Sequence, residues 1–284
     1  MVVLVTGASG QLGESIQFIS KHCPEIAFRF FSSSELNILD IEAVANIFES
    51  VKPDYCINTA AYTAVDKAEL EPEKAYAVNV TGVKNLAETC KKNNTILLHI
   101  STDFVFDGSK TTPYKESDPT NPQGVYGKTK LEGERVIETI LQNYFIIRTS
   151  WVYSEFGHNF MKTMLRIGRE KNQLSIVNDQ IGTPTNAIDL AEALVKIILF
   201  AERDKSIFES QFKILNFSNE GQCSWYDFAR KIFEINNIQV NLQPISSEEY
   251  PTAAKRPSYS VLDKSKIKEI FGFEIKDWEE RLKL

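Results

Sequence analysis

The sequence predicts an α/β fold in which a doubly wound parallel sheet is joined to a smaller C-terminal α/β lobe. Short apolar strands alternate with amphipathic helical stretches over residues 1–150, which is typical of right-handed βαβ units. A glycine-rich turn directly follows the first apolar strand and opens a helix. The length of 284 residues is roughly twice that of a typical domain and favours two lobes.

Five apolar segments are expected to form the parallel sheet. Several are apolar on both faces, as buried parallel strands are, and the stretches between them repeat apolar residues at helical spacing. The predicted strands are Val2–Val5, Ala27–Phe31, Tyr55–Asn58, Ile96–Ser101 and Phe145–Thr149; the predicted helices are Leu12–His22, Ile41–Val51, Ala64–Tyr76, Thr81–Lys92 and Val125–Gln142.

The alternation is interrupted by a long loop and becomes irregular after residue 150. The segment Asp103–Gln123 is rich in Pro, Asp, Thr and Gly, and it is longer than loops without a function usually are. Later segments are separated by Pro and Gly. Among them we predict helices at Asn159–Arg169, Asp189–Ala201 and Trp225–Ile235 and a strand at Lys213–Phe217.

Composition and charge exclude several classes of protein. The chain is 43% hydrophobic and 25% charged, as ordinary globular proteins are. A net charge of −6 argues against a nucleic-acid partner, because phosphate contacts need a basic surface. The N-terminus resembles a strand and not a signal peptide, and no apolar run approaches the ~18 residues of a membrane span. The four cysteines, which form no C-x-x-C pair, fit a reducing cytosol, so we expect a cytoplasmic protein without a membrane segment.

The segment Thr6–Gly13 reads T-G-A-S-G-Q-L-G and carries the chemistry of dinucleotide binding. Glycines allow a tight turn and close approach to a pyrophosphate, which the N–H groups at the helix N-terminus then bind. The lysine of a P-loop is absent, which excludes an NTPase of that class. The first lobe is therefore predicted to be a Rossmann-type NAD(P) domain, in which the loop residues Gly7, Ser9, Gly10, Gln11, Leu12 and Gly13 contact the cofactor.

The domain boundaries follow from this placement. We assign residues 1–150, with roughly 187–217 returning to the sheet, to the NAD(P)-binding domain. Residues 151–186 together with 218–284 form the predicted substrate-binding lobe.

Tyr126 and Lys130 lie four residues apart and therefore share one helical face. In a hydride-transfer site the tyrosine hydroxyl donates a proton to a carbonyl oxygen, and a neighbouring ammonium lowers the pKa of that hydroxyl. Lys130 can also hydrogen-bond the nicotinamide ribose. Ser101 or Thr102, at the end of the preceding strand, can orient the same substrate oxygen, since ligands bind at the carboxyl ends of parallel strands.

These motifs resemble the extended short-chain dehydrogenase/reductase superfamily. The match includes the glycine spacing, Asn58-Thr59-Ala60-Ala61 after the third strand, Asn79-Val80-Thr81-Gly82, Ser101-Thr102-Asp103 and Tyr126-Gly127-Lys128-Thr129-Lys130. The resemblance adds the following expected cofactor contacts: Ser32, Asn37, Ile38, Ala60, Ala61, Tyr62 and Asn79, with Tyr126 and Lys130.

Longer segments resemble the dTDP-4-dehydrorhamnose reductase family within this superfamily. They include Ser101–Gly108, Val125–Glu134, Arg148–Tyr153, Asn178–Thr185 and Arg256–Ser260. The resemblance implies NAD(P)H-dependent reduction of the C4 ketone of dTDP-4-dehydro-L-rhamnose, with Thr102, Tyr126 and Lys130 as the catalytic set. It also implies a substrate pocket lined by Val65, Thr102, Asp103, Phe104, Trp151 and Arg256. A Trp151 face can stack on a pyrimidine, and Arg256 can meet a diphosphate, although core packing and a surface position are the alternatives.

Other activities stay open at this point. A sugar-nucleotide dehydratase has Thr-Asp-Glu after the fourth strand, whereas Phe104 occupies the third position here and cannot transfer a proton. An epimerase or another sugar-nucleotide reductase uses the same Tyr–Lys pair, and a noncatalytic regulatory subunit of methionine adenosyltransferase keeps it as well. The histidines form no H-E-x-x-H motif, and His99 is most simply a satisfied histidine in or beside the sheet.

Cofactor choice, metal binding and assembly are weakly specified. The residues about 20 positions beyond the glycine turn are Ser32-Ser33-Ser34, followed by Glu35, so a strong selector for either ribose is absent. We therefore expect NADPH and NADH to be used, with a modest preference for NADPH. Family members can form a homodimer around Mg²⁺ held partly by C-terminal glutamates. Glu279 and Glu280 lie near the end of this chain, but we assign no metal ligand.

Overall fold

The computed structural model describes residues 1–209 and 212–282 and confirms the predicted fold class. Its main sheet has six strands in the order β10-β5-β4-β3-β1-β2, and all neighbouring pairs are parallel. The chain order reverses at β1, which is where doubly wound sheets bind ligands. The strands are β1 (Val2–Thr6), β2 (Ala27–Phe31), β3 (Tyr55–Asn58), β4 (Ile96–Thr102), β5 (Tyr144–Thr149) and β10 (Ile214–Asn216).

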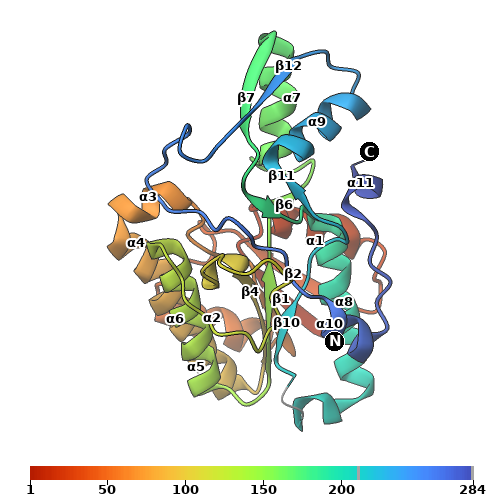
Figure 1. Cartoon of the computed structure of the whole chain (residues 1–284). Helices are drawn as coiled ribbons and strands as arrows, with labels where there is room; N and C mark the ends of the chain where they lie inside the picture. Colours follow the sequence, from red (N-terminus) through yellow and green to blue (C-terminus); the bar gives the residue numbers. More distant parts are fainter. Residues whose placement is uncertain (210–211, 283–284) are drawn as a thin grey trace.

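Helices cover both faces of this sheet, and each layer encloses a separate apolar core (Figure 1). One layer consists of α1 (Gln11–Ser20), α8 (Ala187–Arg203) and α10 (Ser265–Phe271). The other consists of α2 (Ile41–Val51), α5 (Val83–Asn93) and α6 (Val125–Ile140). The side chain of Asp40 caps α2 by accepting from Glu42 N and Ala43 N, which explains why the helix begins at Ile41.

The chain between β3 and α5 differs from the single helix predicted over Ala64–Tyr76. It forms α3 (Val65–Leu70) and α4 (Pro72–Tyr76), and a π-helical turn at Ala77–Gly82 then leads into α5. Pro72 has no N–H to continue the helix, so the chain turns at Glu71 before α4 begins.

A second lobe lies beyond the carboxyl edge of the main sheet, at the top of Figure 1. Its two-stranded parallel sheet pairs β7 (Gln173–Val177) with β12 (Asn241–Ile245), and α7 (Phe160–Glu170) and α9 (Trp225–Ile235) enclose its apolar core. The short strands β6 (Val152–Tyr153) and β9 (Thr185–Asn186) pair with each other, as do β8 (Ile181–Gly182) and β11 (Cys223–Ser224). The helix α11 (Trp278–Arg281) is the last described element.

The division into two domains at the predicted boundaries remains a prediction. The segment that was expected to return to the sheet contains α8 and β10, and β10 pairs with β5. Lys283 and Leu284, at the end of the predicted substrate lobe, lie outside the described residues. No helix within the described part of the chain is long and apolar enough to span a membrane.

A buried ion pair fixes α6 against the sheet. Arg148 on β5 donates from Nε and Nη2 to the two carboxylate oxygens of Glu134, at 3.0 and 2.6 Å, and Ser101 Oγ donates to the same carboxylate. The side chains of Arg148 and Glu134 are only 3% and 1% exposed. Removal of one partner would leave a buried charge without compensation.

Glu134→Ala should therefore lower the free energy of unfolding by about 3–5 kcal/mol, the usual effect of breaking a buried pair. Urea unfolding measures this change. Glu170→Ala is the matched control, because it removes the exposed pair between Arg166 and Glu170 and should cost less than about 1 kcal/mol. Equal effects of the two variants would contradict an anchoring role for Glu134.

Candidate active site and cofactor site

The glycine turn lies at the carboxyl end of β1 and fits a pyrophosphate. Gly7 has φ = +68°, a conformation that favours glycine. A Cβ atom at this position would lie only 2.6 Å from Ala60 N, so a larger residue would clash with the backbone after β3. Gly10 is the N-cap of α1 and offers no side chain to the N–H groups of the first turn. Ser9 and Gly10 are exposed, which leaves this helix N-terminus accessible to an anionic group.

The other three residues predicted from the glycine turn, Gln11, Leu12 and Gly13, pack around the turn or bond to neighbouring segments. Leu12 and Gly13 are buried behind the turn. The Gln11 side chain donates to Val152 O at 3.1 Å and accepts from Asn159 Nδ2 at 2.6 Å. This side chain therefore links α1 to the second lobe, a contact that the sequence did not indicate.

The predicted cofactor contacts Ser32, Asn37 and Ile38 follow β2. Glu35 turns back on Ser32 and accepts from its N–H at 2.8 Å and its hydroxyl at 2.6 Å. These hydrogen bonds lower the pKa of Glu35 and keep a negative charge beside Ser32. Asn37 is exposed, whereas Ile38 is buried.

The segment after β3 presents Ala60, Ala61 and Tyr62, all partly exposed, beside the glycine turn. Asn79 is fully buried behind them. Its Oδ1 accepts from Tyr62 N at 2.9 Å, and its Nδ2 donates to Tyr62 O and to Thr129 Oγ1. The structure thus places Asn79 as a support that joins this segment to α6.

Tyr126 and Thr102 come together where β4 ends. Desolvation raises the pKa of Tyr126 to about 12, and the charge of Asp103 acts in the same direction, whereas the neighbouring Thr102 side chain opposes the shift. The net shift is opposite to the lowering expected from the sequence. A Cβ atom on Gly127 would lie 2.3 Å from Phe104 O, so this glycine allows α6 to approach the turn Asp103–Val105. Because its pKa is about 12, the Tyr126 hydroxyl is protonated at neutral pH and can act as a proton donor.

Lys130 lies one helical turn beyond Tyr126 and is buried. Its Nζ donates to Ile100 O at 2.7 Å and lies 3.1 Å from His99 Nε2. Burial lowers the pKa of Lys130 to about 8, although the carboxylate of Glu134 opposes this shift. From the sequence we expected His99 to be a core histidine with its hydrogen bonds satisfied in or beside the sheet. The sequence did not indicate its contact with Lys130.

The predicted substrate residues other than Trp151 occupy two places. Asp103 and Phe104 follow Thr102 directly, and the Phe104 ring packs edge-on against Tyr126 with centroids 5.6 Å apart. Arg256 reaches α3, beside Val65, where its guanidinium donates to both Asp66 carboxylate oxygens at 3.1 and 2.7 Å. Arg256 is thus already paired with a carboxylate at the position where a diphosphate was expected.

Trp151 lies between the two lobes and has an unusual backbone conformation. Its φ is +46°, a strained value for a residue with a Cβ atom. Its ring stacks on Trp225 of α9 with centroids 3.5 Å apart and packs against Gly182. Packing accounts for part of this position, while the strain is of the kind that concentrates at functional sites.

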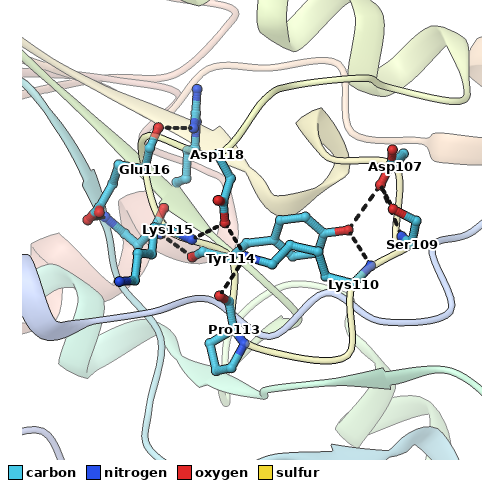
Figure 2. Close-up of polar contacts among 10 residues, drawn as sticks. Asp107, Ser109, Lys110, Pro113, Tyr114, Lys115, Glu116 and Asp118 are labelled. Carbon is cyan, nitrogen blue, oxygen red and sulfur yellow. Dashed lines mark hydrogen bonds and ion pairs between the residues drawn. The ribbon is translucent and has the colours of Figure 1, made fainter.

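The long loop after β4 is ordered by its own polar contacts (Figure 2). Ser109 N, Ser109 Oγ and Tyr114 Oη all donate to Asp107 Oδ1, and these bonds lower the pKa of Asp107 to about 2. The Tyr114 ring stacks on Phe106, and Tyr114 N donates to Val261 O at 2.8 Å. The loop therefore ties the end of β4 to the C-terminal segment that carries Arg256.

Within the described residues, no group of three or more His, Cys, Asp or Glu side chains is arranged to hold a metal ion.

Asp103 makes stability depend on pH. Its Oδ2 is buried and has no hydrogen-bond partner among the described residues, and burial raises the pKa of this carboxyl from 3.8 to about 6. Between pH 3.8 and about 6, the folded state keeps the proton on Asp103, whereas the unfolded chain has released it. The stabilisation is complete below pH 3.8 and is lost as the pH rises through about 6.

Asp103→Asn keeps the shape of this side chain without the charge. The free energy of unfolding of the variant, relative to the natural protein, should rise by about 2–3 kcal/mol between pH 4 and pH 7. Urea unfolding across this pH range measures the difference. A difference that stays constant with pH would show that Asp103 is not a buried, uncompensated carboxyl.

Comparison with known proteins agrees with this geometry. Residues 1–284 match the family model described as the RmlD substrate binding domain. The chain is 43% identical over 291 residues to dTDP-4-dehydrorhamnose reductase of Aggregatibacter actinomycetemcomitans, and the alignment covers 99% of this chain and 97% of the relative. A crystal structure of a dTDP-4-dehydrorhamnose reductase from Clostridium acetobutylicum is 41% identical with a TM-score of 0.92, covering 100% of this chain and 97% of that one.

A second crystal structure, of dTDP-4-dehydrorhamnose reductase from Bacillus anthracis in complex with NADP, is 38% identical with a TM-score of 0.92. It covers 99% of this chain and 96% of its own. These similarities confirm the resemblance inferred from the sequence. The chain therefore belongs to the dTDP-4-dehydrorhamnose reductase family.

Proposed function

We propose that this protein reduces the C4 ketone of dTDP-4-dehydro-L-rhamnose to dTDP-L-rhamnose with NADPH or NADH. One observation carries the proposal: the phenol of Tyr126, which desolvation keeps protonated, lies beside Thr102 and Phe104 at the sheet edge that also bears the glycine turn. The names of the most similar relatives support the same substrate, and the NADP complex of one relative supports the cofactor.

The reacting side chains have separate tasks in this proposal. The nicotinamide, when bound, supplies a hydride to the substrate carbon. Tyr126 Oη donates its proton to the ketone oxygen. The Thr102 hydroxyl, which donates to Asp103 Oδ1 at 3.0 Å in this structure, turns to the ketone oxygen and orients it through a second hydrogen bond. Lys130 positions Tyr126 and hydrogen-bonds the nicotinamide ribose. Val65, Asp103, Phe104, Trp151 and Arg256 are the proposed contacts to the sugar and nucleotide.

The residue after Asp103 favours reduction over elimination. The Phe104 ring packs against Tyr126 in a T-shaped arrangement and has no group that can move a proton. A dehydratase needs an acid or base at this place. An epimerase would use the same Tyr–Lys pair but would return the hydride to the sugar, so net oxidation of the cofactor separates the two activities.

The test is an assay of NADPH and NADH oxidation with a panel of 4-keto nucleotide sugars. We expect one cofactor to be oxidised for each dTDP-4-dehydro-L-rhamnose consumed. Turnover of other sugars alone, or sugar conversion without net cofactor oxidation, would contradict the proposal. A homodimer and a cytoplasmic location remain separate predictions, and no metal ligand is assigned.

Tyr126→Phe removes the proposed proton donor and keeps the ring. Turnover should fall by about 10²–10⁴, the usual contribution of general acid–base catalysis, while NADPH binding stays unchanged. Steady-state kinetics and calorimetry measure the two quantities. Tyr76→Phe, at an exposed tyrosine, is the control and should leave both unchanged. Normal turnover of Tyr126→Phe would remove this residue from the mechanism.

Glu35 should determine the balance between the two cofactors. Because its carboxylate is held against Ser32, it would repel a ribose 2′-phosphate placed there. This repulsion should limit the preference of the natural protein for NADPH over NADH to less than about tenfold, which corresponds to about 1.4 kcal/mol, so that both cofactors are used. Glu35→Ser should raise the ratio of kcat/KM for NADPH to that for NADH by about tenfold, whereas Glu49→Ser on α2 should not. An unchanged ratio in Glu35→Ser would mean that the ribose lies elsewhere.

A further inference from the structure

A chain of buried polar groups runs behind Lys130, away from the substrate side. Lys130 Nζ lies 3.1 Å from His99 Nε2, and His99 Nδ1 lies 3.0 Å from Asn58 Nδ2. Asn58 Oδ1 in turn accepts from Thr6 Oγ1 at 2.7 Å. Thr6 and His99 are 0% exposed and Asn58 is 1% exposed, so water does not replace these contacts.

The orientation of the Asn58 amide is fixed by a backbone donor. Ala60 N–H can only donate, and it lies 3.1 Å from Asn58 Oδ1. If the amide were turned over, its NH₂ group would face this N–H. The carbonyl oxygen therefore faces Ala60 and Thr6, and the NH₂ group faces His99.

This orientation fixes the tautomer of His99. The NH₂ group of Asn58 can only donate, so His99 Nδ1 must accept and carries no proton. The neutral ring then carries its proton on Nε2, which points at Lys130. An ammonium group also has only donors, so the contact is a hydrogen bond when Lys130 is a neutral amine whose lone pair accepts from His99.

The surroundings of Lys130 are consistent with this state. On β4 it faces His99 and the carbonyl of Ile100, to which it donates. On α6 it lies between Tyr126 and Glu134, and the Glu134 carboxylate is already bound by Arg148 and Ser101. Burial lowers the pKa of Lys130, and the Nε2 donor of His99 acts in the same direction. Burial holds the pKa of His99 well below its usual range, which excludes a doubly protonated ring.

We propose that His99 is a positioning residue for the reaction: held by Asn58 with its proton on Nε2, it donates to the neutral amine of Lys130 and thereby lowers the affinity of Lys130 for a proton in the cofactor-free protein. His99 thereby sets the pH at which Lys130 becomes charged beside Tyr126. The consequence for catalysis rests on the proposed function, whereas the tautomer and the state of Lys130 do not.

The tautomer of His99 can be measured without substituting any of the four hydrogen-bonded residues, which are Lys130, His99, Asn58 and Thr6. Long-range ¹H–¹⁵N NMR correlations of the cofactor-free protein show which ring nitrogens are protonated. His22 and His158 are exposed, and their signals are assigned with His22→Gln and His158→Gln. We expect His99 to be protonated on Nε2 and bare on Nδ1 between pH 6 and 9. A proton on Nδ1 would overturn the proposal.

Two variants test the effect on Lys130. In His99→Gln the amide can turn its oxygen to Lys130, and in Asn58→Asp a carboxylate accepts from His99 Nδ1 and leaves Nε2 as an acceptor. Each should raise the titration midpoint of Lys130 by one pH unit or more, a tenfold change in proton affinity, read from its ¹³Cε signal. An unchanged midpoint in a folded variant overturns the proposal.

Enzyme kinetics separate this role from simple packing. In the pH profile of kcat/KM, the inflection caused by the titration of Lys130 should move to higher pH in His99→Gln. A packing defect would instead lower kcat at every pH and leave the position of the inflection unchanged. If the protein does not reduce the dTDP-sugar but the NMR results hold, only the proposed function fails. If the sugar is reduced and the Lys130 midpoint does not move, only the role of His99 fails.

Discussion

The close contact between α6 and β4 is the constraint on which the rest of the candidate site depends. It places Tyr126 and Lys130, which lie on one face of α6, against the end of the strand that carries Thr102. Three features hold it: the absence of a side chain at Gly127, the bond from Lys130 to Ile100 O, and the buried carboxylate of Glu134. A shift of α6 by one residue would separate the hydroxyl groups and bury the lysine elsewhere.

The same contact controls the electrostatics of the site. Tyr126 has a raised pKa and Lys130 a lowered one, because both lie in a desolvated region between helix and strand. The Glu134 carboxylate opposes the shift of Lys130, but it is already paired with Arg148. The protonation of Lys130 then depends also on its uncharged neighbours, which in our proposal include His99 held by Asn58.

The sequence predicted local elements well where capping and periodicity act within a few residues. The helices Ile41–Val51 and Trp225–Ile235 have the expected bounds, and Asp40 and Ser224 cap them. The short strands of the second lobe were missed. In β12, Pro244 weakens the strand pattern, and the pairing with β7 depends on a segment about 70 residues away.

The candidate site shows the same limit. The glycine turn and the Tyr–Lys pair are local motifs, so the sequence indicated them directly. Arg256 with Asp66 and Trp151 with Trp225 are contacts between distant segments, and His99 appeared as an ordinary core residue. Side-chain partners of this kind become visible only when the sheet brings their strands and loops to one edge.

The most direct test of the central claim follows the hydride itself. The natural protein is supplied with dTDP-4-dehydro-L-rhamnose and with NADPH in which both hydrogens of the reactive nicotinamide carbon are replaced by deuterium, and the product is analysed by NMR and mass spectrometry. The account predicts one deuterium on C4 of dTDP-L-rhamnose for each cofactor oxidised. Product without deuterium at C4, or an isomerised sugar formed without net oxidation of the cofactor, would contradict it.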